Sequence, residues 1–208
     1  MISGSRWGAI AMKTTGRKSR ALVILLSLTT ATGAQAAQPM QIDTGKSVMK
    51  VHVFKSGLFS AFGHEHEIGA PIESGSFSQD PPLVDLKVSA KKMRVEDKDI
   101  SDKDRAEIQQ TMLGPKVLDS ERFPEIQFRA TQVKKLGENT WQADGELTVR
   151  GQTRPVTIVV RKENGAYKGS TELKQKDFGI TPVSAGGGSV KTKNELRIDY
   201  EIYVKSGP

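Results

Sequence analysis

The stretch Leu196–Val204, which reads LRIDYEIYV, decides the fold class of this chain. Its first, third, fifth, seventh and ninth residues are Leu, Ile, Tyr, Ile and Val, and mostly charged residues stand between them. A period of two is typical of a β-strand with one buried face and one face in water. This stretch therefore predicts a half-buried strand.

The same alternation recurs toward the N-terminus. Residues 84–90, 126–130, 141–149 and 156–160 alternate in the same way, and turn sequences such as Asn164-Gly165 separate the runs. Strands at this spacing predict an antiparallel meander, either a barrel or a sandwich.

One segment departs from the period of two. From Ser101 to Leu113, apolar residues recur at helical spacing, with Ala106, Ile108 and Met112 on one face. Ser101 is a suitable N-cap, and Gly114-Pro115 ends the pattern. The sequence predicts one short helix here.

The first 36 residues have the pattern of a secretory leader. Basic residues precede the apolar run Ala21–Leu28, and small residues lead to Ala34-Gln35-Ala36. This order predicts a signal peptide, 1–36, cleaved before Ala37. The apolar run is far shorter than the roughly 20 residues of a membrane-spanning helix, so we expect no integral membrane protein. We expect export to the periplasm, although such a leader alone does not distinguish the periplasm from full secretion.

Composition narrows the function classes. The chain has 31 basic and 24 acidic residues. Five of the basic residues and none of the acidic ones lie in the leader, so the remainder carries a net charge of about +2. No basic stripe interleaved with aromatic residues is present, and we expect no nucleic-acid partner. The chain has no cysteine, so an exported domain must be held together by its apolar core alone.

Three histidines within 15 residues are the sharpest chemical signal. His64 and His66 would project from one face of a strand, and His52 precedes them in the chain. If His52 lay opposite His64, the three rings could bind zinc and leave one position open. A register shifted by one residue would separate them. The same residues could instead line a pocket or stand on a strand surface.

Other motifs do not support catalysis. Gly186–Ser189 lacks the spacing of a phosphate-binding loop, and Asp177-Phe178-Gly179 stands without the remaining kinase motifs. No serine lies in a nucleophile elbow, and cysteine nucleophiles are absent. We therefore expect no enzyme.

A series of short motifs, each weakly specific alone, runs in a characteristic order along nearly the whole mature chain. They are Ser47–Val51, Phe62–His66, Gly75–Phe77, Met112–Leu113 through Val117–Leu118, Phe123–Phe128, Gly145–Thr153, Asp177–Ile180 and the final alternating strand. In this order they resemble the YceI-like family of exported lipid-binding proteins. Gly63-His64-Glu65-His66 is similar to the G-H-x-H branch of that family.

The resemblance implies an all-β fold. It is an extended antiparallel lipocalin-like β-barrel of about eight strands with one short helix, formed by a single domain, 37–208. It also implies an apolar interior that holds a polyisoprenoid or a related amphiphilic lipid. The residues that the resemblance places near the ligand are Phe54, Phe62, His64, His66, Phe77, Ile126, Phe128, Trp141, Leu147, Ile158, Phe178 and Ile180.

The leading hypothesis is a non-enzymatic periplasmic protein that sequesters or transports an isoprenoid-type lipid or quinone. No covalent cofactor is expected, and a homodimer is compatible with the sequence. The alternative is a zinc-dependent hydrolytic or metal-carrying protein that uses His52, His64 and His66. A third possibility is a barrel without a ligand, whose aromatic side chains fill its core.

Overall fold

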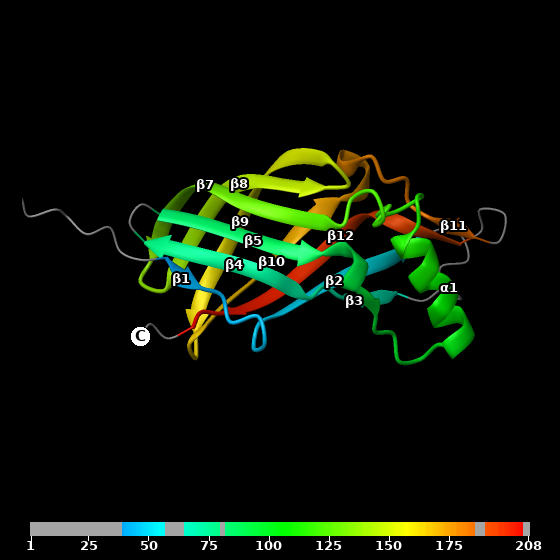
Figure 1. Ribbon diagram of the computed structural model, residues 1–208, viewed down its shortest axis with the longest axis horizontal. Helices are drawn as coiled ribbons and strands as arrows, with labels where there is room; N and C mark the ends of the chain where they lie inside the picture. The colour runs from blue at the N-terminus through cyan, green and yellow to red at the C-terminus, as the bar shows by residue number, and fades with distance from the viewer. Residues whose placement is uncertain (1–38, 57–64, 80–81, 186–189, 206–208) are drawn as a thin grey trace, which may run out of the picture. The chain divides into compact units, whose positions relative to one another are not determined.

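The computed structural model describes residues 39–56, 65–79, 82–185 and 190–205, all of them within the unit Ala36–Pro208 (Figure 1). The described chain is a curled antiparallel sheet with one α-helix. Its strands are β1 (Met40–Gln41), β2 (Val48–Ser56), β3 (His66–Gly69), β4 (Ile72–Gln79), β5 (Pro82–Ser89), β6 (Arg94–Val95), β7 (Glu125–Gly137), β8 (Thr140–Val149), β9 (Gln152–Glu163), β10 (Ala166–Lys174), β11 (Ser184–Ala185) and β12 (Val190–Tyr203). The helices are η2 (Ala90–Lys92), α1 (Asp102–Leu113) and η3 (Gln175–Phe178).

The strands form one sheet in the order β1-β4-β5-β7-β8-β9-β10-β12-β2-β3-β6, and β11 pairs with β12. This path returns to its start at two points. Ile42, which follows β1, forms an isolated bridge with Val204, which follows β12. β3, which pairs with β2, is separated from β4 by only two residues. The sheet is therefore curled into a barrel, as the resemblance to the YceI-like family implied.

The number of strands differs from the prediction. The sheet has twelve strands, against about eight expected. Four of them, β1, β3, β6 and β11, have only two to four residues. A run this short cannot display a period of two, so it gives no signal in the sequence. The eight longer strands match the expectation.

α1 confirms the helix predicted at Ser101–Leu113. The Ser101 hydroxyl oxygen accepts a hydrogen bond from the Asp104 backbone amide at 3.1 Å, which is the geometry of an N-cap. At the other end, the Gly114 amide donates to the carbonyls of Gln110 and Thr111. Met112 is the buried residue of the helix, whereas Ala106 is exposed. The helix therefore presents a narrower apolar face than expected, at one end of the sheet (Figure 1).

The core consists of two clusters of buried side chains. One lies near α1 and includes Ile68, Met93 and Met112. The other includes Phe128 and Phe178. Partly buried residues such as Val117, Ile126 and Val149 pack against both clusters, so the apolar interior is continuous. In the part of the chain that the structure describes, no helix is long and apolar enough to cross a membrane.

Candidate functional site

An apolar cavity of about 250 Å³ lies inside the barrel. Side chains from β2, β3, β4, β5, β7, β8, β9, β10 and β12 line it, together with residues of the helices and loops at its ends. Among the described residues that line it there is no Asp, Glu, Lys, Arg or His. Side chains therefore leave part of the interior unfilled. A barrel without a ligand was expected to have an interior that its own side chains fill.

Eight of the residues predicted near the ligand line this cavity. They are Phe77, Ile126, Phe128, Trp141, Leu147, Ile158, Phe178 and Ile180. Strand register explains the agreement, because directly paired residues point to the same face of a sheet. Phe128 lies opposite Leu147, and Ala143 lies opposite Ile158.

Phe178 and Ile180 reach the cavity from η3 and the segment after it. Gly179, between them, has a φ of 69°, a left-handed conformation that favours glycine. The Arg150 guanidinium donates hydrogen bonds to the carbonyls of Gly179 and Pro115, both at 2.7 Å. Arg150 thus connects the η3 segment to the loop after α1.

Phe54 does not line the cavity, which corrects the expectation from sequence. It follows Val53, a cavity residue, and successive side chains of a strand point to opposite faces. Lys193 Nζ and the guanidinium carbon of Arg197 lie 5.9 and 6.0 Å from the centre of the Phe54 ring. Phe62 and His64 fall outside the described residues.

The register between β2 and β3 separates His52 from His66. His52 lies opposite Glu67, and Val53 lies opposite His66, so the two imidazoles point to opposite faces. His52 Nε2 is 3.0 Å from Asp199 Oδ2. No group of three His, Cys, Asp or Glu within the described ranges is placed to hold a metal ion. A zinc site that requires the rings of His52 and His66 on one face of the sheet does not form in this register.

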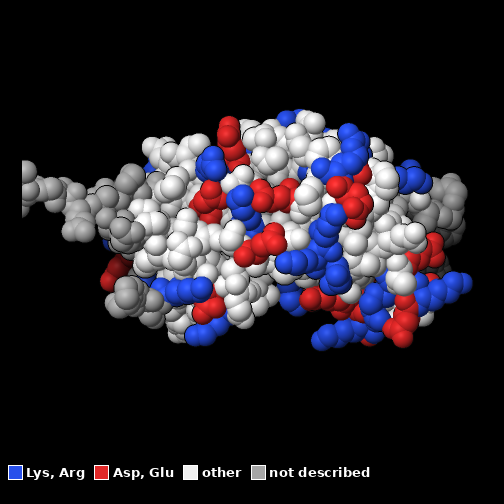
Figure 2. Space-filling model, in the orientation of Figure 1, with Lys and Arg blue, Asp and Glu red and all other residues white. Residues whose placement is uncertain are grey.

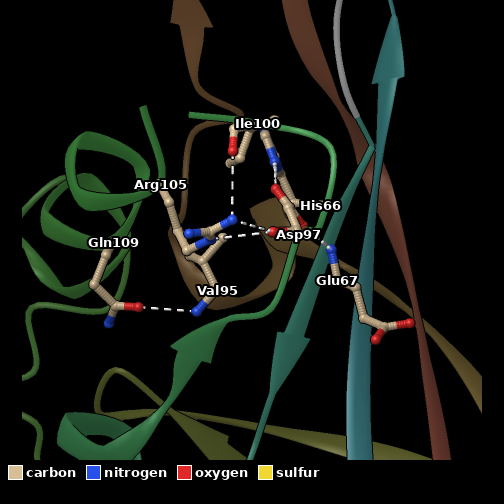
Figure 3. A network of polar contacts seen from close by, with 7 residues as sticks. All are labelled: His66, Glu67, Val95, Asp97, Ile100, Arg105 and Gln109. Atoms are coloured by element: carbon tan, nitrogen blue, oxygen red, sulfur yellow. Dashed lines mark hydrogen bonds and ion pairs between the residues drawn. The ribbon is translucent and has the colours of Figure 1, made fainter. Parts of the chain in front are cut away.

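His66 does not line the cavity either; it belongs to a polar network beside it (Figure 3). His66 Nδ1 is 2.6 Å from Asp97 Oδ2, and the Glu67 amide donates to Asp97 Oδ1 at 2.7 Å. The side chain of Asp97 is only 5% exposed. The Arg105 guanidinium, from α1, donates two hydrogen bonds to the Asp97 carbonyl, at 3.0 and 2.8 Å.

Gln109 makes the second set of contacts between α1 and the sheet. Its side-chain oxygen accepts from the Val95 amide, and its side-chain nitrogen donates to the Met93 carbonyl, both at 2.9 Å. These two backbone groups belong to β6 and the residue before it, at the end of the strand path. Met93 and Met112 both line the cavity. The network therefore holds α1 beside one end of the cavity.

Sequence reasoning missed several cavity residues and the network. Val51, Val53, Tyr200 and Ile202 line the cavity, and their alternation in β2 and β12 was a usable signal. Asp97 gave no signal, because it lies outside the regular elements and its partners are distant in the sequence.

Five described cavity residues carry side-chain nitrogen or oxygen atoms: Trp141, Tyr167, Thr171, Gln175 and Tyr200. Gln175 is buried, and its side-chain nitrogen donates to the Lys193 carbonyl at 2.7 Å. Burial raises the pKa of Tyr200 above its ordinary value. Its phenol therefore stays uncharged at neutral pH.

The outer surface contrasts with this interior. Figure 2 shows Lys and Arg interspersed with Asp and Glu across the face it presents. Lys50 on β2 and Glu67 on β3 form an ion pair whose side chains are partly exposed. The hydrogen bond between them raises the pKa of Lys50 and lowers that of Glu67. The described residues that line the barrel interior carry no charged side chain, in contrast to this surface.

Comparison with known proteins agrees with this geometry. A model of the YceI-like domain matches residues 40–203. A UPF0312 protein from Azotobacter vinelandii is 31% identical over 157 residues, covering 70% of this chain and 80% of the relative. Another, from Pseudomonas savastanoi pv. phaseolicola, is 30% identical over 178 residues, covering 80% and 88%.

Two solved structures share the fold. Burkholderia cenocepacia BcnA has a TM-score of 0.60 at 16% identity, covering 79% of this chain and 99% of that one. A domain from Saccharophagus degradans, described as a polyisoprenoid binding domain, has a TM-score of 0.56 at 9% identity and covers 83% and 100%. The curled barrel, its apolar interior and the match over residues 40–203 lead to one conclusion: the chain belongs to the family of proteins with a YceI-like domain.

Proposed function

We propose that this protein is a non-enzymatic binding protein. It holds a polyisoprenoid or an isoprenoid-quinone-like lipid inside the barrel, for sequestration or transport. The observation that carries the proposal is the cavity, whose lining residues include none with a charged side chain. The Saccharophagus degradans domain, described as binding polyisoprenoid, supports the same ligand class.

The physical basis is burial of apolar surface. Each methylene group moved out of water contributes about 0.8 kcal/mol, so a chain of 20 carbons gains on the order of 15 kcal/mol before the costs of binding. No ion pair is needed for affinity of this origin. The cavity of about 250 Å³ lies just below the roughly 300–1,000 Å³ of pockets for drug-sized ligands.

Native mass spectrometry of the freshly purified mature protein, with solvent extraction, tests the proposal. We expect a co-purifying lipid, or, after its removal, uptake of one isoprenoid quinone or polyprenol per chain. Absence of any lipid together with failure to take up either probe would contradict the proposal.

A pair of aromatic substitutions on β8 sharpens this test. Ala143 is 4% exposed and lines the cavity, so Ala143→Phe places a ring in the ligand's space. Gln142→Phe adds the same ring at the adjacent position, whose side chain points to the other face. We expect Ala143→Phe to lose lipid uptake and Gln142→Phe to retain it, with circular dichroism confirming that both variants fold. If both variants retained lipid uptake to the same extent, the ligand would lie outside the barrel.

The proposed place of action is the periplasm, reached through a cleaved leader. This rests on the basic, apolar and small-residue order of residues 1–36. Expression in a bacterial host followed by osmotic-shock fractionation tests it. We expect the protein in the periplasmic fraction with Ala37 as its first residue. Recovery of the uncleaved chain in the cytoplasm would contradict it.

A further inference from the structure

The ladder between β9 and β10 covers only three residue pairs, although both strands are long. The last pair is Lys168 with Arg161. Continuing this register would place Ser170 opposite Val159, but no pairing forms there. Because of this interruption, the Val159 carbonyl has no backbone partner on β10 and accepts a hydrogen bond from a side chain instead.

Tyr200 supplies that side chain from β12, one strand further away. Its hydroxyl donates to the Val159 carbonyl at 3.2 Å. The ring reaches this position across Gly169, its direct partner on β10. A Cβ atom at Gly169 would lie 2.6 Å from Tyr200 Cε2 and 2.3 Å from the Val159 carbonyl oxygen. Glycine at this position is therefore what allows the phenol to lie there.

Thr171 completes a pair of hydroxyl groups. Its Oγ1 lies 3.3 Å from Tyr200 Oη, and both residues line the cavity. O–H···O hydrogen bonds are usually about 2.7–2.8 Å long, so both contacts of Tyr200 are long. A ligand oxygen could replace or share them at little cost. The phenol of Tyr200 is protonated at neutral pH, as for any tyrosine, and can therefore donate a hydrogen bond.

The other polar residues of the lining are less available. The side-chain nitrogen of Gln175 is committed to the Lys193 carbonyl. The Tyr167 ring packs against Phe77 and Trp141, with centroid distances of 5.6 and 5.7 Å. Tyr200 and Thr171 differ from Tyr167 and from the indole nitrogen of Trp141 because they place two hydroxyl oxygens 3.3 Å apart, where one ligand oxygen can contact both.

We propose that Tyr200 and Thr171 bind one uncharged oxygen of the lipid, a hydroxyl or a carbonyl, while its hydrocarbon chain occupies the rest of the cavity. This inference rests on the proposed function and selects isoprenoid alcohols and quinones within it. A phosphate held inside would be buried without a partner, because no described lining residue is a cation. A phosphorylated head group would therefore remain outside the cavity.

Two matched ligands and a matched variant test the proposal. The ligands are geranylgeraniol and the hydrocarbon of the same chain without its hydroxyl. Their binding to the delipidated mature protein is followed through Trp141, which lines the cavity and is the one tryptophan outside the leader. Tyr200→Phe and Thr171→Val each remove one hydroxyl. Tyr203→Phe is the control, because the Tyr203 hydroxyl donates instead to Glu201.

We expect the unmodified protein to prefer the alcohol. Tyr200→Phe should weaken binding of the alcohol by about three- to tenfold, the net contribution of one hydrogen bond. Binding of the hydrocarbon should not change, and Tyr203→Phe should not alter either affinity. Thr171→Ser, which keeps the hydroxyl, should retain the preference that Thr171→Val reduces.

The possible failures are distinguishable. If Tyr200→Phe weakened both ligands equally, or neither, the hydroxyl pair would be structural and this inference would be wrong, while lipid binding itself would stand. If the unmodified protein bound neither ligand, the proposed function would fail. A change in the ¹³Cζ chemical shift of Tyr200 with the alcohol but not with the hydrocarbon would support direct contact.

Discussion

At the level of single residues, Asp97 carries more contacts than its position suggests. It lies between β6 and α1, in a segment without regular structure. Its two carboxylate oxygens meet His66 Nδ1 and the Glu67 amide, and its carbonyl accepts from Arg105. This one residue therefore connects β3, through its carboxylate, to α1, through its backbone carbonyl.

Asp97→Asn should lower the free energy of unfolding by about 1–3 kcal/mol. An amide has one acceptor oxygen, so it can accept from the Glu67 amide only if its nitrogen donates to His66 Nδ1. The charge-assisted contacts of the carboxylate are then replaced by weaker neutral hydrogen bonds, and one tautomer of His66 is imposed. Urea denaturation measures the change. Asp99→Asn is the control, because Asp99 is exposed. Equal stability of the two variants would contradict the role given to Asp97.

The Lys50–Glu67 pair should make a small, pH-dependent contribution. Its side chains are 37% and 35% exposed, so Glu67→Gln should cost no more than about 1 kcal/mol at pH 7. The hydrogen bond from Lys50 lowers the pKa of Glu67, against the opposing effect of burial. The stabilisation is therefore present above the ordinary glutamate pKa of 4.5 and is lost as pH falls through the lowered pKa.

The pKa of Lys50 sets the upper pH limit of the stabilisation by the Lys50–Glu67 pair. This pKa is raised above 10.5, chiefly by the hydrogen bond to Glu67, so the stabilisation disappears as pH rises through the raised value. Thermal unfolding of the unmodified protein and of Glu67→Gln at a series of pH values measures the difference in their stability. The Lys50–Glu67 pair accounts for the effect if this stability difference is constant between about pH 5 and 10 and disappears in acid. A stability difference that increases in acid would contradict a role for the Lys50–Glu67 pair.

At the level of elements, α1 shows which features a sequence reveals. Both of its ends could be predicted, because Ser101 and Gly114 act on backbone groups of the same helix. Its docking could not be predicted. Gln109 contacts Val95 and Met93, 14 and 16 residues away, and nothing in the local sequence distinguishes it from Gln110.

Gln109→Ala should therefore loosen the contact between α1 and β6, whereas Gln110→Ala should not. The Val95 amide and the Met93 carbonyl lose their partner in the first variant. Gln110 is exposed and serves as the matched control. We expect faster hydrogen exchange at the Val95 amide in Gln109→Ala alone. Equal exchange rates in both variants would show that apolar contacts suffice to hold α1.

At the level of the whole molecule, alternation in the long strands predicted an antiparallel meander, and the resemblance to the YceI-like family selected a barrel and most of its interior residues. Phe54, which the resemblance placed near the ligand, lies outside the cavity lining because it alternates with Val53 along β2. The short strands and the interrupted β9–β10 ladder could not be predicted, since they depend on pairing between distant residues. The cavity is likewise a property of packing, which no single strand encodes.

The most direct test of the central claim is to locate a bound lipid by NMR. Isotope-filtered nuclear Overhauser effects from geranylgeraniol to the methyl-labelled, delipidated protein report which methyl groups lie within about 5 Å. We expect contacts with Ile126, Ile158 and Ile198, which line the cavity, and none with Val48 or Leu136, which are 49% and 55% exposed. Contacts confined to Val48 and Leu136, or no contacts at a saturating concentration of lipid, would contradict a ligand inside the barrel.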